Sequence, residues 1–249
     1  MVIFKSEDDI AKIRNAGRIV ARTLHVLAQH IRSGITTREL DSIAEDEIRK
    51  AGATPSFKGY RGFPASLCVS VNEEVIHGVP SAKKLKEGDI VSLDLGAIWE
   101  GFHGDAARTF TVGNVSNEAK RLMEVTEKSL LMGIEQARPG NRLGDIGHAV
   151  QSYVESHGFS VVREFVGHGI GRNLHEDPQV PNYGKPGQGP RIKPGMVLAI
   201  EPMVCLGRAD VEILSDNWTA VTRDRSLAAH YEHSIAITND GPWVLTTLD

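Results

Sequence analysis

Apolar residues recur every three or four positions in four segments of the chain, which is the spacing of an amphipathic helix. The second segment starts with the capping pair Thr36 and Glu39 and stops at Gly52, as helices commonly do. In the first segment the apolar stripe consists of Ile10, Ile13, Gly17, Val20, Leu24, Leu27 and Ile31. The pattern predicts helices over residues 6–31, 36–51, 116–137 and 143–157.

Short runs of branched apolar residues follow each pair of helices and are typical of strands. The predicted strands cover residues 67–71, 90–95, 105–112, 159–165, 196–205, 218–222, 230–238 and 243–247. A turn is predicted at residues 101–104, so the strand at 105–112 should run antiparallel to the strand at 90–95. The order of two helices followed by strands occurs twice along the chain. We therefore expect an α/β (α+β) fold of two similar halves that share one mixed sheet. Residues 182–194, rich in Gly and Pro, predict a surface loop.

The composition narrows the possible functions. The 249 residues are 41% hydrophobic and 24% charged, which is enough for a substantial core, and the net charge of −4 argues against DNA as a partner. No apolar run approaches the roughly 20 residues that cross a bilayer, and the acidic start lacks the features of a secretory or transit signal. We therefore predict a cytoplasmic protein without a membrane segment. With only Cys68 and Cys205 present, any metal must be held by His, Asp and Glu.

Four acidic residues interrupt apolar strand sequences: Asp94, Asp105, Glu201 and Glu232. A buried carboxylate is costly unless a cation or hydrogen bonds compensate it. Any one of the four taken alone is as well explained by a solvent-facing position on an alternating strand, but four such cases favour a functional cluster. Asp94 and Asp105 are eleven positions apart across the predicted turn, so a hairpin can bring both carboxylates to one end of the strand pair.

Among the histidines, His168 has the strongest context, because it lies in the glycine-rich segment 167–171. Glycines let the backbone approach a ligand closely, so we predict that His168 is a ligand. His77 and His175 lie in loop-like contexts that leave their roles open. The remaining histidines are interpreted as ordinary surface or hydrogen-bonded residues: His25, His30, His103, His148, His157, His230 and His233.

Four carboxylates and an imidazole form an oxygen-rich ligand set, which suits two divalent cations with bridging carboxylates better than a structural zinc ion. Two such cations indicate a hydrolytic or phosphoryl-transfer centre. The sequence lacks the nucleophile elbow, the zinc-binding helix motif, the P-loop and the dinucleotide fingerprint. Cys68 is an alternative nucleophile, although a free cysteine in a strand is more often a small buried hydrophobe.

In this order and spacing, the motifs resemble those of the type I methionine aminopeptidases from end to end. The resemblance rests on residues 72–80, 92–95 with Asp105, 167–171, 199–203 and 231–234. It implies the pita-bread fold, with helices on the outer face of a mainly antiparallel sheet, and a single catalytic domain over residues 1–249. It also implies two divalent metal ions, with Asp94 chelating one, Asp105 and Glu232 bridging both, and His168 and Glu201 completing the other.

The reaction implied by the resemblance is removal of the amino-terminal methionine from nascent proteins and peptides with a small second residue. A metal-bridged hydroxide would attack the scissile carbonyl, and Glu201 would shuttle its proton. His175 would hydrogen-bond the developing oxyanion, and His77 would contact the scissile nitrogen.

Four residues match the positions of the family's methionine pocket: Tyr60, Phe63, Cys68 and Trp218. Aromatic and sulfur-bearing walls suit a polarizable thioether, although plain core packing is an alternative for Phe63 and Trp218. Leu174 stands where relatives commonly have an aromatic residue, so we expect one wall of the pocket to differ.

Two alternatives remain. A prolidase or X-Pro aminopeptidase uses an equivalent metal set but normally carries a large amino-terminal domain, whereas only about ninety residues precede Asp94 here. A non-catalytic binding module on the same fold is disfavoured because all five ligands are present. The physiological metal is open among Mn, Fe(II), Co and Zn. The expected partners are nascent polypeptide amino termini, with transient proximity to the ribosome, and the expected oligomeric state is a monomer.

Overall fold

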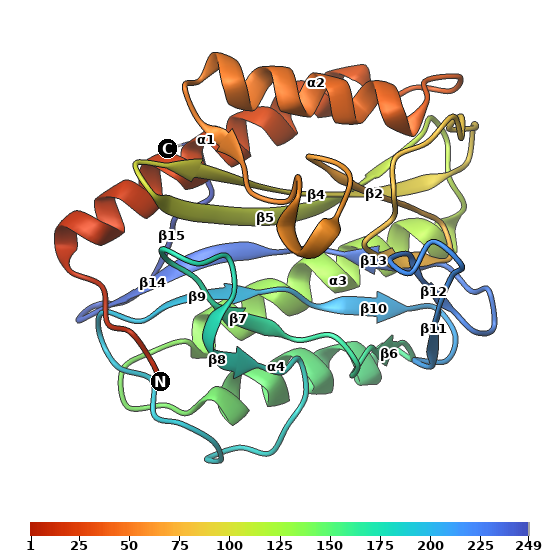
Figure 1. Ribbon diagram of the computed structural model, residues 1–249. Coiled ribbons are helices and arrows are strands. Elements are labelled where there is room, and N and C mark those ends of the chain that lie inside the picture. Colours follow the sequence, from red (N-terminus) through yellow and green to blue (C-terminus); the bar gives the residue numbers. More distant parts are fainter. Residues whose placement is uncertain (249) are drawn as a thin grey trace.

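The computed structural model describes residues 1–248, and its α-helices form two pairs (Figure 1). Each helix begins and ends within one residue of the predicted range. Side-chain oxygens of Ser6, Thr36 and Ser116 accept backbone N–H groups of the first turn in three of the helices, which explains where these helices start. The helices are α1 (Glu7–His30), α2 (Thr37–Lys50), α3 (Asn117–Gln136) and α4 (Leu143–Ser156).

Four of the five strands of the first half form one sheet, in which β4 pairs antiparallel with β1, β2 and β5. A single 3₁₀ turn, η1 (Tyr60–Gly62), lies in the loop between β1 and β2. The strands are β1 (Thr54–Pro55), β2 (Cys68–Val71), β3 (Glu74–Ile76), β4 (Ile90–Trp99) and β5 (Phe102–Thr111).

The remaining strands form three further sheets, with strand orders β15-β14-β9-β7-β8, β13-β10-β6 and β11-β12-β3. In the last of these, β3 of the first half pairs with a strand of the second half. Every strand pair in the described chain is antiparallel, whereas we expected a mixed, mainly antiparallel sheet. These strands are β6 (Ser160–Val161), β7 (Gly167–Gly169), β8 (Glu176–Val180), β9 (Val197–Ile200), β10 (Met203–Cys205), β11 (Val211–Ile213), β12 (Ala220–Thr222), β13 (Ala228–His230), β14 (His233–Thr238) and β15 (Gly241–Val244).

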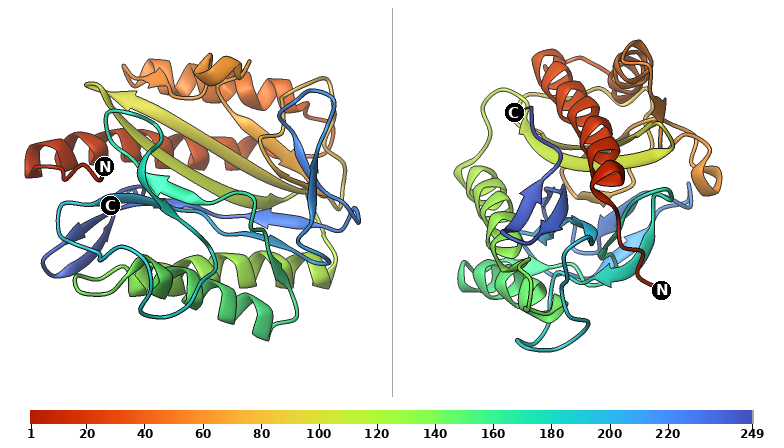
Figure 2. Two further views of the ribbon diagram at one scale, coloured as in Figure 1. Left: turned by 60° about the horizontal axis from the view of Figure 1, so that its bottom comes forward. Right: turned by 90° about the vertical axis from the view of Figure 1, so that its left-hand side faces the viewer.

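The strands lie between the two helix pairs, with α1 and α2 outside one half and α3 and α4 outside the other (Figures 1 and 2). One apolar cluster joins the first helix pair to β2, β4 and β5, for example through Leu24, Leu40 and Leu93. A second cluster joins the other pair to β9 and β10, through residues such as Val150 and Leu198. The predicted twofold repetition is thus present as two helix-covered layers, packed strand face to strand face.

Helix α1 lies directly on the backbone of its neighbours at Gly17. A Cβ added there would lie 2.3 Å from the carbonyl oxygen of Leu245, and one added at Gly104 would lie 2.6 Å from the backbone nitrogen of Gly17. These two glycines therefore set how closely α1 approaches β5. Among the described helices, none has both the length and the apolar content needed to cross a lipid bilayer.

The hairpin of β4 and β5 is longer than predicted, and its turn lies earlier. Glu100 and Gly101 form the turn with φ values of 48° and 80°, and Phe102 already belongs to β5. Asp105 therefore lies inside β5, opposite Gly96, while Asp94 lies opposite Ala107. The two carboxylates are consequently in the middle of the ladder, and the prediction that they meet at one end of the pair was wrong.

The prediction of unbroken strands through Glu201 and Glu232 was also wrong. The predicted strand 196–205 is divided into β9 and β10, and 230–238 is interrupted between β13 and β14. Pro202 has no N–H group to donate, which favours a break directly after Glu201. Both glutamates thus lie where the backbone leaves the ladder, and the hydrogen-bonded strands form four sheets instead of one.

Other strand boundaries differ in ways that local sequence does not reveal. The runs 159–165, 218–222 and 243–247 shorten or shift to β6, β12 and β15. Strand β7 was not predicted because it is glycine-rich, but glycine is needed there: a Cβ at Gly167 would lie 2.3 Å from the carbonyl oxygen of Ala199. The predicted loop at 182–194 is confirmed as free of helix and strand.

A buried ion pair connects the amino-terminal segment to the first residue of β8. Lys5 Nζ contacts the carboxylate of Glu176, and both side chains are 4% exposed. Lys5 Nζ also donates to the carbonyl of Ile3, and Glu176 accepts the N–H of Asn173. Gly171 is small enough to lie against both partners, because a Cβ there would be 2.5 Å from Lys5 Cε. The residue before Glu176 is His175, so this pair supports the loop that carries it.

Breaking this pair from one side is expected to destabilise the protein. Glu176→Gln or Lys5→Met leaves a buried polar group without its partner, which typically costs about 3–5 kcal/mol, whereas the double variant is expected to lose clearly less than the sum. Urea unfolding of the four proteins measures this coupling. The exposed pair Lys12 and Asp8 provides the control, with little change expected for Lys12→Met. Additive losses at Lys5 and Glu176 would contradict the coupling.

Candidate metal centre

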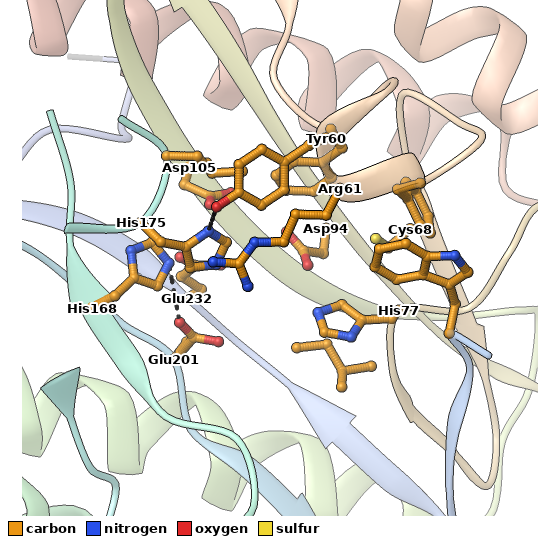
Figure 3. Close-up of a pocket in the computed structure, with 15 residues that line it drawn as sticks. Tyr60, Arg61, Cys68, His77, Asp94, Asp105, His168, His175, Glu201 and Glu232 are labelled. Atoms are coloured by element: carbon orange, nitrogen blue, oxygen red, sulfur yellow. Dashed lines mark hydrogen bonds and ion pairs between the residues drawn. The ribbon is translucent and has the colours of Figure 1, made fainter. Parts of the chain in front are cut away.

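All eleven residues singled out from the sequence line one cavity of about 140 Å³ between the two halves (Figure 3). They come from segments more than 170 residues apart and include the five predicted metal ligands, the two loop histidines and the four predicted pocket residues. The cavity has two distinct walls, one acidic and one apolar.

The acidic wall is formed by four carboxylates, each less than 8% exposed. Asp94 projects from β4 and Asp105 from β5, while Glu201 and Glu232 project from the strand breaks described above. In the described chain, Asp94 Oδ1, Asp105 Oδ1 and Glu232 Oε1 are buried without a hydrogen-bond partner. Buried oxygens of this kind require compensation that the protein's own side chains do not provide.

The backbone around these glutamates is fixed by hydrogen bonds from other segments of the chain. Thr109 Oγ1 of β5 donates to the carbonyl of His230 and accepts its N–H, both at 2.9 Å. The N–H of Glu232 donates to the carbonyl of Ala107 at 2.9 Å, and Asn182 donates to the carbonyl of Glu201 at 3.0 Å. The strand breaks are therefore held in one conformation by side chains and strands distant in sequence.

His168 extends the acidic wall from β7. Its Nδ1–H donates to the carbonyl of Gly169 at 2.9 Å, which leaves Nε2 facing Glu201 Oε1 at 3.5 Å. One ligand atom each from Asp105, His168 and Glu232 lies within 4.8 Å of the other two. Oxygen donors with one imidazole whose other nitrogen is fixed by a carbonyl are the donor set of a divalent metal site. The residues present therefore fit such a metal.

Burial dominates the electrostatics of this wall. It raises the pKa values of Asp105, Glu201 and Glu232 well above their ordinary range and that of Asp94 to about 7. Repulsion between the neighbouring carboxylates adds to this effect for Asp105, Glu201 and Glu232. Burial also lowers the pKa of His168, so its imidazole is neutral and able to act as a ligand.

His77 and His175 lie on either side of the carboxylates, outside the strands (Figure 3). His77 has a φ of 60° and an edge-to-face contact with Phe165, with centroids 5.4 Å apart. His175 Nδ1 is 2.9 Å from the hydroxyl of Tyr60, whose ring stacks on it. Burial lowers the pKa of His77 to about 4 and that of His175 to about 3, so both are neutral at pH 7.

The apolar wall lies beyond His77. Phe63 meets Trp218 edge to face with ring centroids 5.1 Å apart, and Cys68 is buried beside them. Burial raises the pKa of the Cys68 thiol well above its ordinary value, so this residue is a protonated thiol and not the alternative nucleophile. Leu174 completes this wall with Phe57 and Ile76.

Sequence reasoning missed two polar residues at the site. Arg61 lines the cavity, and no periodicity or motif distinguishes it. His230 was interpreted as an ordinary residue, but its Nε2 is buried without a hydrogen bond, 4.0 Å from Glu201 Oε2. His103, in contrast, is a hydrogen-bonded residue as predicted, bonded through Nδ1 to Ser56 Oγ at 2.9 Å. The positions of Arg61 and His230 in the sequence gave no signal, since these two side chains find their surroundings only when the two halves meet.

The raised carboxyl pKa values predict how stability depends on pH. Without metal, the folded state keeps protons that the unfolded chain has lost. The contribution of these carboxyl groups to the stability of the folded state is complete below pH 4 and disappears as the pH rises through their raised pKa values, for Asp94 through about 7. Between pH 7 and 8.5, above the range of the histidines, the Tm of chelator-treated protein is expected to fall. Saturating Mn²⁺ is expected to raise the Tm, and more so at pH 8.5, because bound metal displaces the retained protons.

Thermal unfolding across this pH range, with chelator or with Mn²⁺, measures both effects. Glu232→Gln provides the control, since removing one of the titrating groups should flatten the slope of the metal-free protein. A metal-free Tm that does not change with pH, or a Mn²⁺ effect that shrinks at higher pH, would contradict proton retention by the buried carboxyl groups.

Comparison with known proteins agrees with the fold and with this site. The sequence model of metallopeptidase family M24 matches residues 11–239 of this chain. Methionine aminopeptidase 1 of Bacillus subtilis is 58% identical over 99% of both chains, and the methionine aminopeptidase of Clostridium perfringens is 58% identical over 100% of both. A crystal structure of the Thermotoga maritima methionine aminopeptidase superposes with a TM-score of 0.98 at 48% identity, covering 99% of this chain and 100% of that one. The chain therefore belongs to metallopeptidase family M24 and has the pita-bread fold of its methionine aminopeptidases.

Proposed function

We propose that this protein removes the amino-terminal methionine from peptides and nascent proteins whose second residue is small, by metal-dependent hydrolysis at the cavity between the two halves. The observation that carries the proposal is the cavity itself, in which five buried Asp, Glu and His side chains lie beside a wall of aromatic and sulfur-bearing side chains. The relatives named methionine aminopeptidase, which match nearly the whole chain, support the same activity.

In this proposal the five ligands hold two divalent ions. Asp94 would hold one, His168 and Glu201 would hold the other, and Asp105 and Glu232 would be shared between them. The unpartnered carboxylate oxygens support the assignment, as does the proximity of donor atoms from Asp105, His168 and Glu232. When bound, the cations lower the pKa of a water and polarise the scissile carbonyl.

The other polar residues act on the substrate directly. Glu201 accepts the proton released during attack and returns it to the leaving amine. His175 donates from Nε2 to the scissile carbonyl oxygen as negative charge develops there. That role requires Nδ1 to be an acceptor, so the Tyr60 hydroxyl donates to it across the 2.9 Å contact. His77, neutral and at the opposite side of the carboxylates, contacts the scissile nitrogen.

The methionine side chain occupies the apolar wall. Phe63, Cys68 and Trp218 present aromatic rings and a sulfur atom, and Tyr60 and Leu174 close the same pocket. A thioether is unbranched and polarizable and gains from contacts with such groups. The smaller Leu174 leaves more space on its side of the pocket than an aromatic residue would.

The setting of the reaction belongs to the same proposal. Residues 1–249 act as one catalytic domain, since the amino-terminal Lys5 already contacts the loop of His175. The enzyme works as a cytoplasmic monomer on polypeptides emerging close to the ribosome, with Mn, Fe(II), Co or Zn as its metal. The net charge of −4 is consistent with a peptide rather than DNA as the partner.

Two substitutions separate metal binding from substrate activation. Glu232→Ala removes a bridging ligand and is expected to lose bound metal and activity together. His175→Ala keeps every ligand, so we expect normal metal content with turnover reduced about 10²- to 10³-fold. Metal analysis and methionine release from Met-Ala-Ser, with Ala-Pro-Ala in the same tube and a chelator-treated control, measure these outcomes.

A fully metallated and active Glu232→Ala protein, or near-normal turnover by His175→Ala, would overturn the residue assignments. Cleavage of Ala-Pro-Ala in place of Met-Ala-Ser would identify an X-Pro aminopeptidase. Metal binding without cleavage of either peptide would favour a binding module.

A further inference from the structure

Arg61 is the only lysine or arginine among the residues that line the cavity of the described chain, and the proposed reaction gives it no role. It lies in η1 at the rim, is exposed, and its side chain extends over the mouth of the cavity between His175 and His77 (Figure 3). A cation at the entrance of a peptide-binding cavity is available to a substrate.

The backbone holds this residue in an unusual conformation. Arg61 has a φ of 49°, between Gly59 at 85° and Gly62 at 90°, whereas side chains other than those of glycine and asparagine rarely adopt this region. Two backbone hydrogen bonds close the loop, from Gly62 to the carbonyl of Gly59 and from Phe63 to that of Tyr60. Sparsely populated conformations tend to occur where function requires them. Here the conformation directs a long cation toward the cavity.

Arg61 is also in contact with the catalytic machinery. Its guanidinium lies over the ring of Tyr60, 5.3 Å from the centroid, and the hydroxyl of Tyr60 bonds to His175. The positive charge of Arg61 contributes to the lowered pKa of His175. Contacts therefore connect Arg61 through Tyr60 to His175 at the rim of the cavity.

The guanidinium has no acidic partner of its own. Within residues 1–248, no carboxylate lies within ion-pair distance of Arg61, whereas the nearby Lys58 is paired with Glu45 at 2.7 Å. The four carboxylates of the acidic wall face inward, where the proposed cations compensate them. The guanidinium of Arg61 is thus available to interact with a charged group of a peptide bound at the rim of the cavity.

The course of the substrate follows from the proposed function, on which this inference rests. The first residue fills the apolar wall, His175 contacts the scissile carbonyl, and the second residue is small. The chain then leaves past Tyr60, beside His175. The third residue is the first one that can present a charged side chain to Arg61.

We propose that Arg61 is a specificity-determining residue that favours substrates with aspartate or glutamate at the third position. The guanidinium forms a charge-assisted contact with that carboxylate and repels a lysine or arginine placed there. Because the contact is exposed, its effect on kcat/KM is modest and is screened by salt.

The test compares the amidated peptides Met-Ala-Glu-Ser, Met-Ala-Gln-Ser and Met-Ala-Lys-Ser with the metal-loaded enzyme. We expect kcat/KM for the glutamate peptide to exceed that for the glutamine peptide by about two- to five-fold, with the lysine peptide lowest, and the ratios to approach one in roughly 0.5 M NaCl. Arg61→Asn tolerates the left-handed backbone and should abolish the preference. Arg61→Lys should keep part of it, and Arg61→Glu should reverse it.

Lys58→Asn is the matched control, because it removes a nearby exposed cation that does not line the cavity. It should leave the ratios unchanged. Equal ratios in the wild type and Arg61→Asn, or the same loss in Lys58→Asn, would overturn the proposal. A uniform fall for all three peptides in Arg61→Asn would also overturn it, in favour of a general positioning role. Failure of the wild type to release methionine from the neutral peptide would instead overturn the proposed function, and this inference with it.

Discussion

Four carboxylates are buried side by side at the meeting of the two halves, and the rest of the structure depends on that constraint. Such a cluster is unfavourable unless cations or protons compensate it, and the raised pKa values of Asp105, Glu201 and Glu232 express this cost. Each layer contributes to the cluster, so neither half contains the site alone. Compensation by divalent metal therefore links the stability of the fold to its chemistry.

The surroundings of the cluster hold its members in place without supplying counter-charge. Thr109 and Asn182 fix the breaks at Glu232 and Glu201 through backbone hydrogen bonds, and Gly169 fixes the tautomer of His168. The loop of His175 is supported from the opposite direction, by the buried pair of Lys5 and Glu176. The predicted ligands and the predicted substrate-facing groups are thus positioned by separate parts of the chain, which is why we expect mutation to separate metal binding from turnover.

The sequence was sufficient for features that depend on nearby residues. The helix boundaries follow from local periodicity and from caps such as Ser6 and Thr36, and the acidic residues that interrupt apolar runs do line one cavity. The sequence was not sufficient where contacts with a distant part of the backbone determine where a strand begins or ends. The breaks beside Glu201 and Glu232 depend on contacts with loop 182–194 and with β5, and the close approach of Ala199 to Gly167 makes a glycine-rich segment into a strand. Arg61 and His230 become recognisable only after the halves meet.

The most direct test of the dinuclear centre is anomalous diffraction from crystals grown with Mn²⁺. We expect two peaks roughly 3.5–4 Å apart, as in other two-metal sites. One should lie against Asp94 and the other against His168 and Glu201, with Asp105 and Glu232 between them. A single peak, or peaks whose ligands lie outside these five residues, would contradict the claim that this carboxylate cluster is a dinuclear metal centre.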